Sequence, residues 1–262
     1  MRRCAAAWLL LAFALVGAPR ADAAAERLDF PLRGRMLTSW VYRPAGTPKG
    51  TVIMGSGDVG WVGLAVDLSN FLSAQGFLVV GVNVRQYLSS FTVGKTNLAV
   101  TDPPADYEAL AQLLKRRGLL TEPVIVSGVS EGAALAVLAA SSPRNHEWLR
   151  GVVTMGVPAT AELAWRWTDF PAWIMKSDAH EPSFAARDFV ATVSPLPLVM
   201  IQSRKDEYVP EADYKALEQN AKSPKKLVLI DASNHRFTDR RRELEREYLA
   251  ALAWIQSVKP SS

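Results

Sequence analysis

Five residues near the middle of the chain, Gly128-Val129-Ser130-Glu131-Gly132, form a G-x-S-x-G sequence between two apolar segments. The segment before it, 123–127, is typical of a short buried strand, and the alanine-rich segment 133–140 predicts a helix. A strand that turns directly into a helix strains the turn residue and exposes its side chain at the carboxyl edge of the sheet. The two glycines leave room for that turn. The pattern predicts a nucleophilic serine at position 130.

Apolar runs of strand length alternate with amphipathic runs of helix length along the rest of the chain. The expected strands are 28–32, 36–42, 51–54, 77–82, 123–127, 151–155, 196–201 and 226–230, and the expected helices are 62–74, 106–117, 133–140, 211–221 and 240–258. The first two strands flank a turn at Gly34 and are expected to pair antiparallel. The alternation predicts an α/β fold with a mostly parallel, doubly wound sheet and helices on both faces. Residues 158–195 are too long for a plain connection and are expected to form a small lid-like insertion.

The first 23 residues have the composition of a secretory signal peptide, with a basic start, an apolar run and a small-residue cleavage site at 21–23. The alternative is an uncleaved amino-terminal membrane anchor. Cys4 is the only cysteine in the chain and lies in the basic start, which argues against a lipoprotein anchor. We expect residues 24–262 to form one exported domain without disulfides, periplasmic or secreted.

A serine hydroxyl needs a base to take its proton and an acid to orient that base. Of the three histidines, only His235 follows a predicted strand at the carboxyl edge where Ser130 is expected, whereas His146 and His180 lie in polar or irregular segments. Asp206 follows the penultimate strand and is the expected acid, with its neighbour Glu207 as the alternative. Asp231 is interpreted as structural. The order Ser130, Asp206, His235 is the order found in α/β-hydrolases.

A tetrahedral oxyanion needs two hydrogen-bond donors, usually backbone N–H groups. We expect one from Glu131, which directly follows the serine, and the other from the glycine-rich loop 55–60, at Gly57 or Asp58. The alternative of a phosphate-binding loop fails because there is no G-x-x-x-x-G-K-[ST] sequence and no nearby lysine. Gly55, Gly57 and Gly60 also fit a dinucleotide-binding spacing, but that signal is weak because the preceding strand is common to both folds.

Charge and residue usage argue against nucleic-acid-binding and metal-binding functions. The chain has 30 Lys and Arg against 26 Asp and Glu, and much of the basic charge is paired locally with acids in the closing helix. We therefore expect no nucleic-acid partner. No close histidine pair and no cysteine pair is present, so we expect no metal and no other cofactor. The sequence sets no oligomeric state.

Two stretches, Gly55–Trp61 and Gly76–Leu88, are similar to the bacterial AcvB/VirJ virulence-factor family within the α/β-hydrolase superfamily. The first resembles that family's Ser-Gly-Asp-Gly-Gly-Trp loop. This chain departs from the family pattern at Val59, at Leu88-Ser89-Ser90 and at Glu131. The resemblance implies an α/β-hydrolase fold and a periplasmic serine hydrolase, in a family implicated in hydrolysing lysyl-phosphatidylglycerol.

An aromatic-rich insertion over the site favours an acyl or lipid ester, which would also bring the protein into peripheral contact with a membrane. The expected pocket residues are Trp61, Tyr87, Trp165 and Trp167; the alternative is that the aromatics of the insertion only pack it onto the domain. Negative charge at Glu131 and Asp58 would favour a cationic aminoacyl ester. The competing function is a non-catalytic periplasmic binding or accessory protein on the same scaffold.

Overall fold

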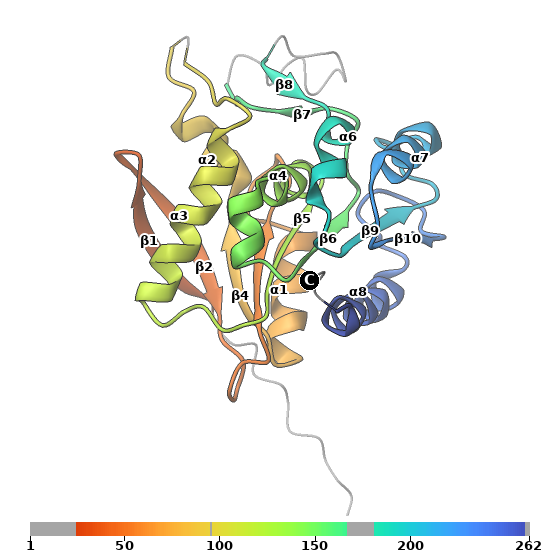
Figure 1. The fold of residues 1–262 in the computed structure, drawn as a ribbon, viewed down its shortest axis with the longest axis horizontal. Coiled ribbons are helices and arrows are strands. Elements are labelled where there is room, and N and C mark those ends of the chain that lie inside the picture. Colours follow the sequence, from red (N-terminus) through yellow and green to blue (C-terminus); the bar gives the residue numbers. More distant parts are fainter. Residues whose placement is uncertain (1–24, 95, 167–180, 260–262) are drawn as a thin grey trace, which may run out of the picture.

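The computed structural model describes residues 25–94, 96–166 and 181–259, and within them eight strands form one sheet (Figure 1). The strand order is β1-β2-β4-β3-β5-β6-β9-β10, with β2 antiparallel to both of its neighbours and the other neighbouring pairs parallel. The strands are β1 (Glu26–Leu32), β2 (Arg35–Tyr42), β3 (Thr51–Gly55), β4 (Leu78–Val82), β5 (Val124–Val129), β6 (Gly151–Met155), β9 (Leu198–Ser203) and β10 (Lys225–Ile230). The predicted mostly parallel sheet is confirmed.

Helices cover both faces of the sheet (Figure 1). They are α1 (Leu64–Ala74), α2 (Val84–Ser90), α3 (Asp102–Arg116), α4 (Glu131–Ala140), α6 (Ala186–Phe189), α7 (Glu211–Asn220) and α8 (Arg241–Ser257). Buried side chains of α1 and α8 pack in one core cluster, and those of α2, α3, α4 and α6 pack in the other. α4 is buried from Gly132 to Ala140 because its small residues let it lie close against the sheet.

The predicted elements are confirmed with small shifts at their ends, and three helices differ from the prediction: α3 begins earlier, and α2 and the short α6 were not predicted. α3 begins at Asp102 rather than at 106, because Pro103 and Pro104 fit the first helical turn, where no N–H partner is needed. α2 was not predicted. It follows β4 directly, and the Asn83 side chain accepts the Gln86 N–H (3.1 Å) at its start.

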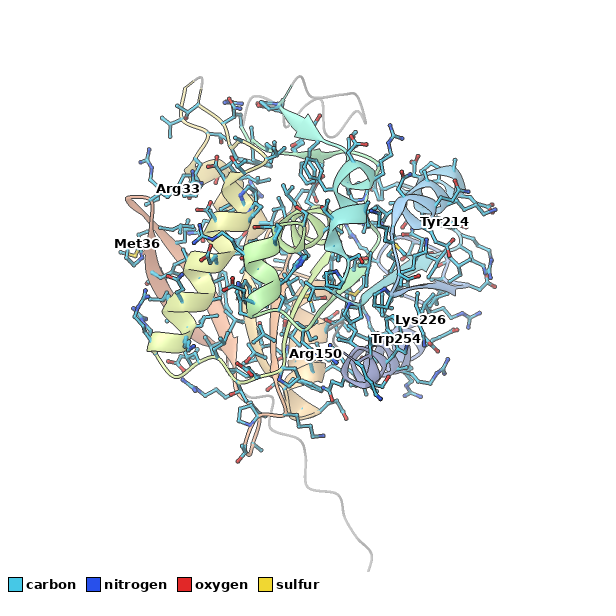
Figure 2. The ribbon with its side chains drawn as sticks, viewed as in Figure 1. Arg33, Met36, Arg150, Tyr214, Lys226 and Trp254 are labelled. Carbon is cyan, nitrogen blue, oxygen red and sulfur yellow. The ribbon has the colours of Figure 1, made fainter. Side chains whose placement is uncertain are left out.

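α8 is tied to the sheet at its centre and at its outer edge. Tyr248, in the middle of the helix, donates its hydroxyl to Ser127 Oγ (2.7 Å) on β5, three residues before Ser130. Lys226 Nζ on β10 lies 4.6 Å from the ring centre of Trp254, and Figure 2 shows these two side chains as neighbours. The helix therefore supports the strand that carries the predicted nucleophile.

The described ends of the 158–195 segment are ordered parts of the domain. β7 (Ala161–Glu162) pairs antiparallel with β8 (Ser183–Phe184), and Figure 1 places this short pair beyond the end of the main sheet, above α4. Phe184 is buried and packs edge-on against Phe189 of α6. For Phe184 the packing interpretation of the insertion's aromatics is therefore the correct one. In the residues that the structure describes, no helix is long and apolar enough to cross a membrane; the predicted signal peptide lies outside those residues.

Candidate active site

Ser130 lies at the turn between β5 and α4, and its backbone has the strained conformation expected from the sequence. Its φ is 53° and its ψ is −121°, a region that L-residues rarely adopt. The N–H of Ser130 donates to the carbonyl of Met155 at the end of β6 (2.9 Å), and the Ser130 carbonyl accepts the N–H of Ala133 (2.8 Å). The side chain, which is partly exposed, therefore stands at the carboxyl edge of the sheet.

The two glycines of the G-x-S-x-G sequence are required by close backbone contacts. A Cβ atom on Gly132 would lie 2.6 Å from the carbonyl carbon of Gly55, at the end of β3. A Cβ atom on Gly128 would fall on the backbone of Gly132 itself. Since real Cβ atoms do not approach backbone so closely, only glycine lets α4 start this near the strands.

Asp206 and His235 are brought together from two loops. His235 Nδ1 lies 2.7 Å from Asp206 Oδ2, and the Asp206 side chain is fully buried. The same Oδ2 accepts the amide of Gln202 (2.8 Å), and Oδ1 accepts the N–H groups of Tyr208 (2.9 Å) and Val209 (3.0 Å). With donors on both oxygens the carboxylate acts as an acceptor, so Nδ1 donates the hydrogen and Nε2 is the ring nitrogen left to exchange a proton with Ser130.

Glu207, the alternative acid, has a different partner. Its Oε2 accepts the backbone N–H of His235 (2.7 Å), while the imidazole itself binds Asp206. The adjacent acids thus hold the same histidine at two different points. Sequence reasoning assigned neither this contact nor that of Gln202, because nothing in residue spacing shows which way adjacent loop side chains point.

His235 and Ser130 both lie beside the end of β6. The chain turns at Gly156 (φ 60°), and a Cβ atom there would lie 2.5 Å from His235 Cε1. Met155, the preceding residue, holds the Ser130 N–H. His235 Nε2 is buried, and within the described part of the chain it has no hydrogen-bond partner. A buried ring nitrogen without a partner costs free energy, which is typical of a catalytic group.

The expected oxyanion donors lie beside the serine. Glu131 begins α4, so its N–H is one of those that have no carbonyl partner within the helix. From the other side, a Cβ atom on Gly57 would lie 3.6 Å from Ser130 Cβ, which places the loop after β3 against the serine. Asp58 follows in that loop, close enough for its charge to act on Glu131.

The Glu131 carboxyl group lies among other acids. Burial, reinforced by the negative charges of Asp58 and Glu162, raises the pKa of the Glu131 carboxyl well above its ordinary value of 4.5. The Glu162 N–H on β7 donates to Glu131 Oε2 (3.2 Å), which opposes part of this rise. Glu131 therefore links the serine turn to β7, and Glu162 is an acid of the site that sequence reasoning missed.

A pocket of about 900 Å³ opens next to the loop after β3, and two of the four residues expected to line a substrate pocket line it. These are Trp61 and Trp165. Trp40 on β2 also lines the pocket and was not predicted. The fourth expected residue, Trp167, lies outside the described residues.

The expectation for Tyr87 was wrong. Tyr87 is buried in α2, and its hydroxyl donates to Asp106 Oδ2 (2.7 Å), which also pairs with Arg33 (2.7 Å). Its burial raises the pKa of its hydroxyl well above the ordinary value. The positions of Val84, Tyr87 and Leu88 have the spacing of one apolar helix face, which is the signal that would have placed Tyr87 in the core.

The remaining candidates have structural partners. A ring nitrogen of His146 lies 2.8 Å from the carbonyl of Ala140, and Asp231 pairs with Lys205 (3.2 Å) at the surface. His180 lies outside the described residues. No group of three or more histidine, cysteine or acidic side chains is arranged to hold a metal ion in the part of the chain that the structure describes.

The strand order, the serine turn and the chain order of the three side chains define an α/β-hydrolase fold. Comparison with solved structures supports the same fold. The chain superimposes on an esterase domain from Rhodothermus marinus with a TM-score of 0.61, at 20% identity over 87% of this chain and 97% of that one. A putative dienelactone hydrolase from Klebsiella pneumoniae gives a TM-score of 0.66, at 16% identity over 87% of this chain and 98% of that one.

The chain belongs to the bacterial virulence protein (VirJ) family, whose sequence profile matches residues 50–253. Among curated proteins it is similar to the uncharacterized protein YfhR of Escherichia coli, with 24% identity over 233 residues that cover 86% of this chain and 79% of that protein. The family resemblance seen in the sequence is confirmed.

Proposed function

We propose that the protein is an exported serine hydrolase that cleaves a carboxylic ester or an aminoacyl ester. The observation that carries the proposal is the state of His235, whose Nδ1 is held by Asp206 while its buried Nε2 has no partner in the described residues. Esterase and hydrolase neighbours of the same fold support the general reaction class. The export proposal rests on the amino-terminal sequence alone.

In the proposed reaction Ser130 Oγ attacks the ester carbonyl carbon and His235 Nε2 takes its proton. The carbonyl oxygen becomes an oxyanion, which accepts hydrogen bonds from the Glu131 N–H and from the N–H of Gly57 or Asp58. When the C–O bond to the alcohol breaks, the imidazolium returns the proton to the leaving oxygen. Water then attacks the acyl-enzyme by the same route and restores the Ser130 hydroxyl.

The acids around Glu131 support an aminoacyl ester as the narrower proposal. The negative charges of Asp58 and Glu162 both act on the Glu131 carboxyl, directly beside the serine turn. A substrate ammonium group bound among them would offset this mutual repulsion, whereas a neutral ester would not.

A fluorophosphonate label tests the proposal against a non-catalytic accessory function. We expect covalent labelling of the wild-type protein and none of Ser130→Ala or His235→Ala. Absence of labelling in the wild type, or equal labelling of Ser130→Ala, would favour the accessory protein. A panel of simple esters, lipid esters and aminoacyl esters then identifies the substrate class.

A further inference from the structure

The pocket lined by Trp61 and Trp165 is connected to the proposed oxyanion loop, and through it to Ser130, by a short stretch of backbone. Gly60 lines the pocket, and its N–H donates to the carbonyl of Gly57 (3.1 Å), which in turn lies against Ser130. Trp61 follows and forms the next part of the wall. A substrate whose carbonyl lies at Ser130 can therefore extend into this pocket along one side of the loop.

One wall of the pocket is a rigid pair of indole rings. Trp40 on β2 and Trp61 stack with ring centres 5.7 Å apart and an angle of 8° between their planes. Trp61 Nε1 also donates to the Tyr42 hydroxyl (3.1 Å). A Cβ atom at Gly81 on β4 would overlap the Trp61 ring, so the absence of a side chain there is what seats the indole. The pair is held in place before any ligand arrives, which lowers the entropic cost of binding.

The apolar character of the wall continues at its rim. Val59 and Val62 line the pocket and are among the exposed large apolar side chains of the protein. Exposed apolar side chains that border a concave site are typical of ligand-binding positions.

Polar side chains that line the pocket already form hydrogen bonds, ion pairs or ring contacts within the protein. Asn83 caps α2, and the Gln86 side chain accepts the backbone N–H of Thr38 (3.1 Å). The Arg85 guanidinium lies over the Trp165 ring at 4.2 Å, and Arg166 pairs with Glu181. No carboxylate is among the described residues that line the pocket. The pocket can therefore bind an apolar group of a ligand, whereas a cationic group would have no negatively charged side chain to pair with.

We propose that this pocket binds the apolar half of the ester that is cleaved at Ser130, and that Trp40 is the residue that determines specificity for bulky apolar groups. The inference rests on the proposed hydrolase function. It assigns the cationic part of any aminoacyl substrate to the acids around Glu131 and the apolar part to the indole wall.

The test compares small and bulky esters in Trp40 variants. The acyl series is p-nitrophenyl acetate against p-nitrophenyl octanoate, and the alcohol series is ethyl acetate against octyl acetate. We expect Trp40→Ala to lower kcat/KM for the bulky ester about tenfold in at least one series, because burial of apolar area on the indole is lost. The small esters should change by less than about twofold, and Trp40→Phe should recover most of the loss.

Met36→Ala is the matched control, because Met36 lies on the same strand but projects from the outside of the β1–β2 hairpin (Figure 2), with 64% of its surface exposed. It should leave all rates unchanged. An equal fall for small and bulky esters in Trp40→Ala, or no fall in either series, would overturn the proposed pocket.

A second measurement separates this inference from the hydrolase proposal. Binding of octyl acetate to the Ser130→Ala protein is measured by calorimetry, with and without the added Trp40→Ala change. We expect the second change to weaken binding about tenfold even if the wild type hydrolyses no ester. Unchanged affinity would contradict the pocket assignment whatever the outcome of the activity assays.

Discussion

Gly156 lies directly against the imidazole of His235, so that a Cβ atom on residue 156 would fall 2.5 Å from Cε1 and 2.9 Å from Nδ1. A side chain at position 156 would push on the ring, whose Nδ1 is bonded to Asp206 at 2.7 Å. Gly156 therefore fixes the position of the proposed base although it contributes no side chain.

Gly156→Ala should displace the imidazole and lower kcat/KM about a hundredfold, because a shift of about 1 Å in a catalytic group can cost that much. The matched control is Gly118→Ala. Gly118 has nearly the same φ (66° against 60°), but no atom lies within 4 Å of its added Cβ. Both changes should lower the free energy of unfolding by about 1–2 kcal/mol through the left-handed backbone, and only Gly156→Ala should lose activity. Equal activity in the two variants would contradict the positioning role.

The two adjacent acids should differ sharply in their effect on activity. Asp206→Asn is expected to lower kcat about a thousandfold or more, because the amide no longer orients and stabilises the imidazolium. Glu207→Gln keeps an oxygen that can accept the His235 N–H and should stay within about threefold of the wild type. Steady-state kinetics of the two purified variants measure this difference in kcat. A larger loss in Glu207→Gln than in Asp206→Asn would reverse the assignment of the acid.

Glu131 should make the stability of the protein fall as the pH rises. Because the pKa of its carboxyl is raised on folding, the folded chain binds more protons than the unfolded chain between the ordinary value of 4.5 and the raised one. The free energy of unfolding therefore decreases with pH across that window, and the full penalty is present above it. Glu131→Gln should raise Tm at pH 8 and change it little at pH 4.

Asp188→Asn serves as the control for that measurement, since the Asp188 side chain is 68% exposed and pairs only loosely with Arg187, at 3.9 Å. It should shift Tm at neither pH by a comparable amount. A lower Tm for Glu131→Gln at pH 8 would mean that the carboxylate stabilises the fold, contrary to the raised pKa.

Glu131→Gln should also change the substrate preference of the enzyme. At a pH above the raised pKa of Glu131, Glu131→Gln should lower kcat/KM for a lysyl ester about tenfold or more, since a charged hydrogen bond to the ammonium is lost. Hydrolysis of an uncharged ester of the same alcohol should be spared. Competition assays with the two esters measure the ratio directly. An equal effect on both esters would remove the support for an aminoacyl substrate.

Local sequence determined the scaffold and the turn that carries Ser130. Strand and helix patterns are set by neighbouring residues, and the glycines at 128 and 132 identify a backbone contact that no other residue permits. The chain order of Ser130, Asp206 and His235 could be read in the same way, because the carboxyl ends of parallel strands meet at one edge of the sheet.

Tertiary structure alone decided what each side chain faces. Asp206 rather than Glu207 meets the imidazole because the N–H groups of Tyr208 and Val209 turn its carboxylate inward. The hydrophobic spacing of α2 places Tyr87 on its buried face, but the partner of its hydroxyl, Asp106 of α3, is set only by the tertiary structure. Trp40 joins the pocket wall because β2 pairs with β4, whose Gly81 leaves space for Trp61. These contacts join residues that are distant in sequence or depend on the rotation of a loop, and neither is encoded in local residue spacing.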